Sequence, residues 1–444
     1  MIELIIGAPD IKIVRDVVLG QPAEGCAVLM ATEVARSDGT IRLLVRGFII
    51  PEVSDYAYRS ELGVELVPAF VAKVTKQALK NAEALVFIHS HPGEKTPQFS
   101  LIDDAGEARL GAFLAHRLPT VHHVSLVISE GGVCARRLGS SELIRVIVLG
   151  ENREVLFDPS EKNLDISSVF DRQVRAFGMG AQITLENLHV AIVGLGGTGS
   201  LVSQQLAHLG VRNFTLIDPD ILEESNLNRV VNTGPEDVGH SKVEIAARYI
   251  HKTAKDTIVT PIIGDIMRVK IARELLNADM IFGCTDSHGS RAILQQVAYQ
   301  YMIPCIDMGS VIVANTDKAT HVFGRVQMLA PGLPCFTCNG LLNSNEVRKD
   351  MMTAFERQAD PYILGVHSPA PAVISLNSVV ASLAVSMFLS AIGGLPSKPR
   401  HIMYNSIRSE IRTLHTRPDD KCYICSRSGA YARGDTWPLF GRND

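Results

Sequence analysis

Residues 189–200 read HVAIVGLGGTGS, an apolar run that passes directly into a glycine-rich stretch. Gly194, Gly196 and Gly199 match the pattern G-x-G-x-x-G, and Gly197 lies between them. A buried strand over 189–193, a glycine turn and a helix over 201–209 would leave free backbone N–H groups and the positive helix end facing a phosphate. The stretch therefore predicts a doubly wound α/β fold of the Rossmann type that binds a nucleotide.

The residues that follow the glycines separate two kinds of nucleotide enzyme. A second strand over 213–217 leads to Asp218, 19 residues after Gly199, where a carboxylate can accept hydrogen bonds from ribose hydroxyls. An NAD-linked oxidoreductase fits these features equally well. A triphosphate with Mg²⁺ fits the further polar residues better, because they exceed what a pyrophosphate needs. These residues are Asp220, Asn226, Arg229, Lys242 and Asp286.

At these positions residues 170–426 resemble the ThiF/MoeB/E1 family of enzymes that activate ubiquitin-like proteins. The resemblance rests on the glycine loop, DRQ at 171–173, DPDILEESNLNR at 218–229, HSKVE at 240–244 and CTDSHGSR at 284–291. It implies an ATP site in which Asp218 holds the ribose, Arg229 and Lys242 the phosphates, and Asp286 the Mg²⁺. Val230 and Ser287 stand where the family usually has Gln and Asn, and neither change removes a charge that the chemistry needs.

The same resemblance implies partners. The substrate would be the C-terminal carboxylate of a ubiquitin-like β-grasp protein, with an E2-like or a sulfurtransferase partner downstream. The fate of the activated protein stays open among conjugation to lysine, sulfur transfer and amide-forming biosynthesis. Arg172 would reach into the site of a second subunit, so we expect a homodimer.

Composition narrows the class of protein. The 444 residues are 46% hydrophobic, enough for two or three globular domains, and 43 basic against 47 acidic residues indicate no nucleic-acid partner. The apolar window 378–393 is interrupted by serines and predicts a buried helix, not a membrane span. Since Met1–Leu4 lacks the features of a signal peptide and the eight cysteines suit a reducing compartment, we expect a cytoplasmic protein.

The first 150 residues do not repeat the glycine pattern and predict a separate mixed α/β domain. We expect a linker over 151–169, the nucleotide domain over 170–426 and a polar tail over 427–444. In the first domain the apolar runs predict strands over 26–31, 41–50, 84–89, 124–129 and 133–138, with helices over 68–81 and 100–116.

Two histidines follow one of these strands in the sequence FIHSHP. His89 and His91 are two residues apart, so they project to the same face and can share a metal ion such as Zn²⁺. Asp103, at the start of the next helix, could supply a third ligand and leave the fourth position for water. A metal-bound water becomes acidic enough to attack a carbonyl when a base is near.

Here residues 20–140 resemble the JAB/MPN (JAMM) metallopeptidases, whose motif is an upstream glutamate, H-S-H-P and S-x-x-D. The resemblance implies that Glu24 is the general base and that Ser100 helps to hold the oxyanion. Eight residues separate His91 from Ser100, one more than is usual. Ser100 and Asp103 also fit a helix N-cap with an acidic third position, and the domain could instead be a docking module without activity.

Cysteines form two C-x-x-C pairs, Cys335 with Cys338 and Cys422 with Cys425, which predict a closed structural zinc site rather than a redox pair. Enzymes of this family that form a thioester usually carry a cysteine between such pairs, but residues 339–421 contain none. Cys26, Cys134, Cys284 and Cys305 fall in or beside predicted strands, where a thiol is more often inert. We therefore expect the reaction to stop at the acyl-adenylate. His288, beside Asp286, fits a structural role better than a catalytic one.

Overall fold

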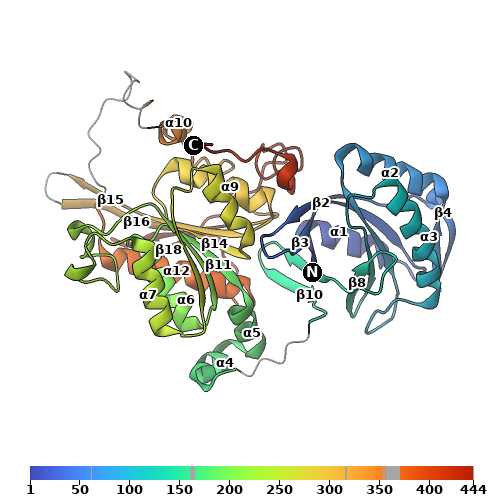
Figure 1. Cartoon of the computed structure of the whole chain (residues 1–444), viewed down its shortest axis with the longest axis horizontal. Coiled ribbons are helices and arrows are strands. Elements are labelled where there is room, and N and C mark those ends of the chain that lie inside the picture. Colours follow the sequence, from blue (N-terminus) through green and yellow to red (C-terminus); the bar gives the residue numbers. More distant parts are fainter. Residues whose placement is uncertain (62, 161–165, 316–317, 354–355, 357–370, 444) are drawn as a thin grey trace. The chain divides into compact units, whose positions relative to one another are not determined.

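The computed structural model describes residues 1–444 except 62, 161–165, 316–317, 354–355, 357–370 and 444. The chain forms two compact units, each built on an eight-stranded sheet (Figure 1). Unit 1 contains residues 1–163, 300–302 and 427–438, and unit 2 contains 164–299, 303–426 and 439–444. Both sheets carry helices, so the expected mixed α/β class is confirmed.

Unit 1 is a mixed sheet with helices on both faces. Along the sheet its strands are β10 (Arg153–Phe157), β9 (Arg145–Leu149), β1 (Ile2–Gly7), β3 (Ile41–Ile49), β2 (Cys26–Ala35), β6 (Ala84–Ser90), β7 (Val124–Ser129) and β8 (Gly132–Arg137). A separate hairpin joins β4 (Tyr56–Ser60) to β5 (Gly63–Leu66).

Alternation along β2 explains the two helical layers of unit 1. Ala27 and Leu29 pack in one apolar cluster with α1 (Ala8–Val18), whereas Val28 and Met30 pack in another with α2 (Pro68–Asn81) and α3 (Leu101–Arg117). Successive side chains of a strand point to opposite faces, so a continuous apolar run is what a strand buried on both faces requires.

The predicted elements of unit 1 are present, and some elements were missed. The ranges 68–81 and 124–129 are confirmed without change as α2 and β7. β1, α1, β9 and β10 were not predicted, and β10 lies inside the stretch 151–169 that was expected to be a linker. Arg153 and Glu154 make β10 look like a loop, but it pairs antiparallel with β9 at the edge of the sheet.

Unit 2 has a parallel half and an antiparallel half. Its strands in order are β13 (Ile258–Ile263), β12 (Asn213–Asp218), β11 (His189–Val193), β14 (Met280–Gly283), β15 (Cys305–Asn315), β16 (Lys318–Leu329), β17 (His401–Asn405) and β18 (Glu410–Thr413). β13 to β15 are parallel and β15 to β18 antiparallel. Strand order reverses between β11 and β14, the switch point where doubly wound folds bind ligands.

The described residues of unit 2 contain eight α-helices. They are α4 (Asp171–Phe177), α5 (Met179–Asn187), α6 (Gly199–Leu209), α7 (Lys242–Thr253), α8 (Val269–Ala272), α9 (His288–Gln300), α10 (Ser344–Met351) and α12 (Ile374–Ala391). α12 is 18 residues long with a mean hydropathy of 1.7, enough by length and composition to cross a membrane, but 61% of it is buried inside the structure. It packs on α6, β15 and β16 as a core helix, as expected for this apolar window.

The C-terminal stretch 427–444 is not a free tail. Residues 427–438 belong to unit 1, where Gly434 lies against Thr32 and Val34 of β2. Gln300 donates hydrogen bonds from Nε2 to the carbonyls of Gly434 (2.8 Å) and Trp437 (2.7 Å). Few apolar residues mark this stretch, and hydrogen bonds to its backbone carbonyls do not depend on the side chains of Gly434 and Trp437, so its sequence alone gave no sign of these contacts.

Candidate functional site

The glycine loop makes a tight turn between β11 and α6. Gly194 has φ +89°, and a Cβ on it would lie 2.6 Å from the carbonyl oxygen of Cys284. A Cβ on Gly199 would lie 1.8 Å from the carbonyl oxygen of Gly194, so only glycine fits both positions. At Gly196, by contrast, no atom of the described residues beyond its chain neighbours lies within 4 Å of where a Cβ would be. The loop is closed against the protein and open where a phosphate would approach.

Asp218 ends β12 beside this loop. Its side chain is buried and accepts hydrogen bonds from the backbone N–H of Leu195 (2.5 Å) and of Asp220 (2.8 Å). Burial raises the pKa of the Asp218 carboxyl, and these two hydrogen bonds oppose the rise. The carboxylate therefore braces the glycine loop at the position expected to hold a ribose.

Lys242, the first residue of α7, is tied to the same loop region. Its Nζ lies 2.8 Å from Oδ2 of Asp220, and its backbone N–H donates to the Asp220 carbonyl at 3.1 Å. The lysine side chain is only 11% exposed, against 61% for Asp220. A phosphate could take the place of the exposed carboxylate without moving the ammonium group far.

Arg229 lies against the glycine loop. Its Cγ would be 3.5 Å from a Cβ on Gly197, and its guanidinium donates to the Ser225 carbonyl at 2.6 Å. Asn226, expected at the nucleotide, is buried, and its side chain accepts a hydrogen bond from the Glu223 backbone at 3.4 Å, closing the turn that precedes Arg229. Asn226 thus shapes the segment that carries the arginine.

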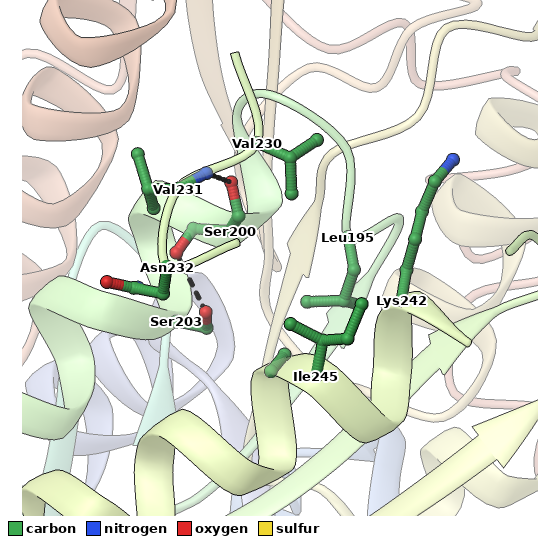
Figure 2. Close-up of a pocket in the computed structure, with 9 residues that line it drawn as sticks. Leu195, Ser200, Ser203, Val230, Val231, Asn232, Lys242 and Ile245 are labelled. Carbon is green, nitrogen blue, oxygen red and sulfur yellow. Dashed lines mark hydrogen bonds between the residues drawn. The ribbon is translucent and has the colours of Figure 1, made fainter. Parts of the chain in front are cut away.

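A small pocket lies next to these groups (Figure 2). Figure 2 shows Ser200 and Ser203 of α6 on one side, and Lys242 and Ile245 of α7 on the other. Its lining residues are Leu195, Ser200, Ser203, Val230, Val231, Asn232, Lys242, Ile245 and Ala246. Val230, one of the two departures from the family pattern, therefore adds an apolar wall beside the glycine loop.

Asp286 is exposed in the loop between β14 and α9. Arg291 donates to the backbone carbonyls of Thr285 (2.9 Å) and Asp286 (3.5 Å), and it pairs with the buried Asp307 at 3.3 Å. Arg325 pairs with the same carboxylate. Arg291 was not predicted at the site, although it ends the stretch CTDSHGSR at 284–291. It holds the loop that presents Asp286.

His288 contacts the start of α10, and Arg172 is exposed to solvent. The Nδ1 of His288 accepts a hydrogen bond from the backbone of Asn343 at 3.3 Å, and the backbone of Gly289 donates to Asp350 at 2.9 Å. His288 therefore has the expected structural role of joining α9 to the start of α10. Arg172 is exposed on α4, and its action in a second subunit stays a prediction.

A second cluster of polar side chains lies in unit 1, at the end of β6. His89, His91 and Asp103 each offer a ligand atom, and these atoms lie within 4.8 Å of one another. Nε2 of His89 is 3.0 Å from Oδ1 of Asp103, and Nε2 of His91 is 3.6 Å from Oδ2. Oε1 of Glu24 is 3.9 Å from the same Nε2 of His91. The four residues expected at a metal centre are thus brought together.

Ser100 and Asp103 begin α3 as a reciprocal cap. The Ser100 hydroxyl oxygen accepts from the Asp103 backbone at 3.2 Å, and the Ser100 backbone donates to Oδ2 of Asp103 at 2.6 Å. The N-cap prediction is therefore confirmed, while Oδ1 of the same carboxylate faces His89 and its role as a metal ligand stays a prediction. The Ser100 hydroxyl still has its own hydrogen to donate.

The donor set fits a divalent metal. Nε2 of His89 is buried and has no hydrogen-bond partner among the described residues. A carboxylate oxygen is nevertheless 3.0 Å away. A nitrogen whose lone pair faces a cation would have these surroundings. Burial acts to raise the pKa of Asp103, but the charge of the nearby His89 and the hydrogen bonds with Ser100 outweigh it and leave the pKa well below its usual value. Burial raises the pKa of Glu24, which suits a base.

The four cysteines of the C-x-x-C pairs also come together. Sγ of Cys335 is 3.7 Å from that of Cys338 and 3.5 Å from that of Cys422, and Cys338 and Cys425 are 3.5 Å apart. Tetrahedral zinc with bonds of about 2.3 Å needs sulfurs about 3.8 Å apart. Backbone N–H groups of Asp419 and Ile424 point at the sulfurs of Cys338 and Cys422. The arrangement fits a closed structural zinc site.

The other four cysteines are poor nucleophiles. Burial raises the pKa of Cys26 to about 12 and raises the pKa values of Cys284 and Cys305 strongly. Burial also raises the pKa of Cys134. Because the thiolate is the reactive form, these shifts disfavour a thioester on any of them.

Unit 2 thus defines a class: a Rossmann-type domain with a glycine loop at the switch point of its sheet, Arg229 and Lys242 beside that loop, and a cluster of four cysteines. Residues 170–424 match the model of the ThiF family, and the chain belongs to this family. This segment is an E1-like, ATP-dependent adenylyltransferase domain.

Three relatives illustrate the match. The molybdopterin-synthase adenylyltransferase of Escherichia coli K12 is 27% identical over 262 residues, 58% of this chain and 96% of that protein. The SAMP-activating enzyme E1 of Haloferax volcanii is 24% identical over 57% of this chain and 85% of its own length. The ubiquitin-like modifier-activating enzyme 5 of Oryza sativa subsp. japonica is 24% identical over 61% of this chain and 64% of its own length.

Proposed function

We propose that the ThiF-family unit adenylates the C-terminal carboxylate of a ubiquitin-like β-grasp protein. The observation that carries the proposal is the placement of Arg229 and Lys242 around an open glycine loop, which suits a polyphosphate. The names of the relatives support the substrate class, because they include enzymes that activate SAMP and a ubiquitin-like modifier.

In this reaction a carboxylate oxygen of the partner protein attacks the α-phosphorus of ATP. The bond from that phosphorus to the bridging oxygen breaks, and its electron pair leaves with pyrophosphate. Arg229, Lys242 and the N-terminus of α6 stabilise the negative charge that develops, while Asp218 orients the ribose. Asp286 would hold Mg²⁺, which neutralises further phosphate charge when bound.

The acyl-adenylate is then the end product of this chain's own chemistry. The described cysteines either lie in the four-cysteine cluster or have raised pKa values, so an outside nucleophile takes the acyl group directly and AMP leaves. That nucleophile would come from an E2-like partner, a sulfurtransferase or an amine. Arg172 acts across a homodimer in this proposal.

Exchange of labelled pyrophosphate into ATP tests the reaction. The whole chain is assayed with a β-grasp protein that ends in glycine, and with the same protein lacking its last residues as the matched control. Exchange only with the intact tail is the expected result. No exchange with any glycine-ended β-grasp protein would overturn the proposal.

We further propose that unit 1 is a zinc peptidase that cuts at the same kind of tail. The convergence of His89, His91 and Asp103, with Glu24 beside them, supports it. Zinc bound there would make a water acidic enough to attack a carbonyl near neutral pH. Glu24 would take the proton of that water, and Ser100 would donate a hydrogen bond to the oxygen that becomes negative. One ligand for both units explains why they share a chain.

Glu24→Gln separates this activity from a docking role. Glutamine keeps the shape of the side chain but cannot accept the proton, so cleavage of a β-grasp precursor or conjugate should fall by at least about 100-fold. Zinc content should not change. If wild-type protein binds zinc only at the cysteine cluster, or if Glu24→Gln cleaves as wild type does, unit 1 is a docking module.

A further inference from the structure

Glu94 lies beside the proposed metal centre on the side away from the other ligands. Its Oε2 is 3.2 Å from Nδ1 of His91, whereas Nε2 of the same ring faces Asp103 at 3.6 Å and Glu24 at 3.9 Å. The imidazole is therefore held at both nitrogens, by one carboxylate on the outside and by the cluster on the inside.

A tight turn brings Glu94 back to the histidine. Residues 91–94 read His-Pro-Gly-Glu, Gly93 has φ +83°, and the Glu94 backbone N–H donates to the His91 carbonyl at 3.4 Å. A type II turn requires a positive φ at its third residue, which is Gly93 here. Proline is common at the second position of such a turn, which Pro92 occupies. The position of Glu94 therefore follows from the local sequence.

The rest of the loop 92–99, which is one residue longer than expected for the family, is fixed to its surroundings. The Gly93 backbone donates to Oε2 of Glu130 at 2.8 Å, and a Cβ on Gly131 would lie 1.8 Å from the carbonyl oxygen of Lys95.

The far end of the loop is fixed as well. The ring of Phe99 lies 3.8 Å from the guanidinium carbon of Arg136 and 6.3 Å from the ring of His89. Arg136 in turn pairs with Asp104 and Glu107 of α3. The longer loop is thus an anchored element.

We propose that Glu94 is a positioning residue for the metal centre: its carboxylate accepts the Nδ1 hydrogen of His91 and so directs the Nε2 lone pair toward the metal. A neutral imidazole has one N–H, so the nitrogen that donates to a carboxylate leaves the other free to ligate. The inference rests on the proposed zinc centre and adds a residue that the family motif does not contain.

The test is the zinc affinity of the whole chain, measured by competition with a chelator. The relevant zinc is the one that His89→Ala removes while the cysteine cluster stays loaded. Glu94→Ala should weaken its binding by 10- to 100-fold. Glu94→Gln should recover most of the affinity, because its amide oxygen still accepts from Nδ1. Glu154→Ala, an exposed glutamate on the far edge strand β10, is the matched control and should bind as wild type does.

Two results would overturn the positioning role. Glu94→Ala could bind zinc as tightly as Glu154→Ala does, or Glu94→Gln could be as weak as Glu94→Ala, which would make net charge the cause. A different result would show that the proposed zinc centre does not exist. In that case wild type and His89→Ala would bind the same amount of zinc, whatever residue stands at position 94.

Discussion

Lys242 and Asp220 form an ion pair of 2.8 Å at the rim of the glycine loop, and the lysine is the more deeply buried partner. Asp220 also donates its backbone N–H to Asp218, so the pair is joined to the carboxylate that braces the loop. A cation that is held by an exposed carboxylate before the nucleotide arrives does not have to be ordered when the phosphate binds.

Lys242→Ala should lower pyrophosphate exchange by at least about 100-fold, since removing one preorganised charge from a developing anion costs 10²- to 10³-fold. The matched control is Lys252→Ala, an exposed lysine in the last turn of the same helix, which should keep wild-type exchange. Equal rates for the two variants would show that Lys242 does not contact the phosphates.

Arg172→Ala should also lower exchange, and mixing it with Lys242→Ala should restore part of the activity. In a mixed dimer one of the two sites would combine an intact Arg172 from one chain with an intact Lys242 from the other. Exchange rates of the separate and mixed variants measure this directly. Absence of any recovery after subunit exchange would argue against action across a dimer.

Cys422→Ser should release the structural zinc and destabilise unit 2. A loss of about 3 kcal/mol would lower the melting temperature by roughly 6 to 12 °C. Cys134→Ser, which alters a cysteine outside the cluster, should keep both the zinc and the melting temperature. Full zinc retention in Cys422→Ser would mean that this cysteine is not a ligand.

Unit 2 should lose stability in mild acid through His401, the first residue of β17. Burial, helped by Arg325, lowers the pKa of His401 to about 4 from 6.5. The unfolded chain then binds the proton more readily, so the contribution of His401 to stability is complete above about pH 6.5 and is lost as the pH falls toward 4. Denaturant titrations should show a loss of about 1 to 3 kcal/mol that His401→Gln lacks. An unchanged pH dependence in that variant would contradict the assignment.

No covalent protein–thioester should accumulate during turnover. The chain is incubated with the β-grasp partner and ATP and then run on a gel without reductant. No band of the two proteins joined together that a thiol reagent removes should appear. Cys284→Ala provides the internal comparison, because Cys284 lies beside the glycine loop. A reductant-sensitive adduct lost only in that variant would make Cys284 a nucleophile despite its raised pKa.

Much of the nucleotide site could be predicted because its residues follow consecutive parallel strands. Strand register and the glycine turn bring Asp218, Lys242 and the loop together, so spacing along the chain translates into spacing in the fold. Arg291 escaped notice because it acts through backbone carbonyls of the loop that carries Asp286. Asn226 is buried and closes the turn that precedes Arg229, and its expected contact with the nucleotide stays a prediction.

The cluster of His89, His91 and Asp103 shows that one sequence pattern can fit two different roles. Ser100 and Asp103 could be a helix cap or part of a metal centre, and in the structure one oxygen of Asp103 caps the helix while the other lies 3.0 Å from Nε2 of His89. Glu94 was not predicted because its position depends on the turn at Pro92 and Gly93. The turn places Glu94 at Nδ1 of His91, which matters only because Nε2 of the same ring faces the cluster.

The return of residues 427–438 to unit 1 has a consequence for synthesis of the chain. A ribosome that has released the first 163 residues has not yet made Gln300 or the segment around Gly434 that complete this unit. The N-terminal unit can therefore reach its final packing only after the nucleotide-binding unit has been translated, and a premature stop shortly before codon 427 would damage the beginning of the protein as well as its end.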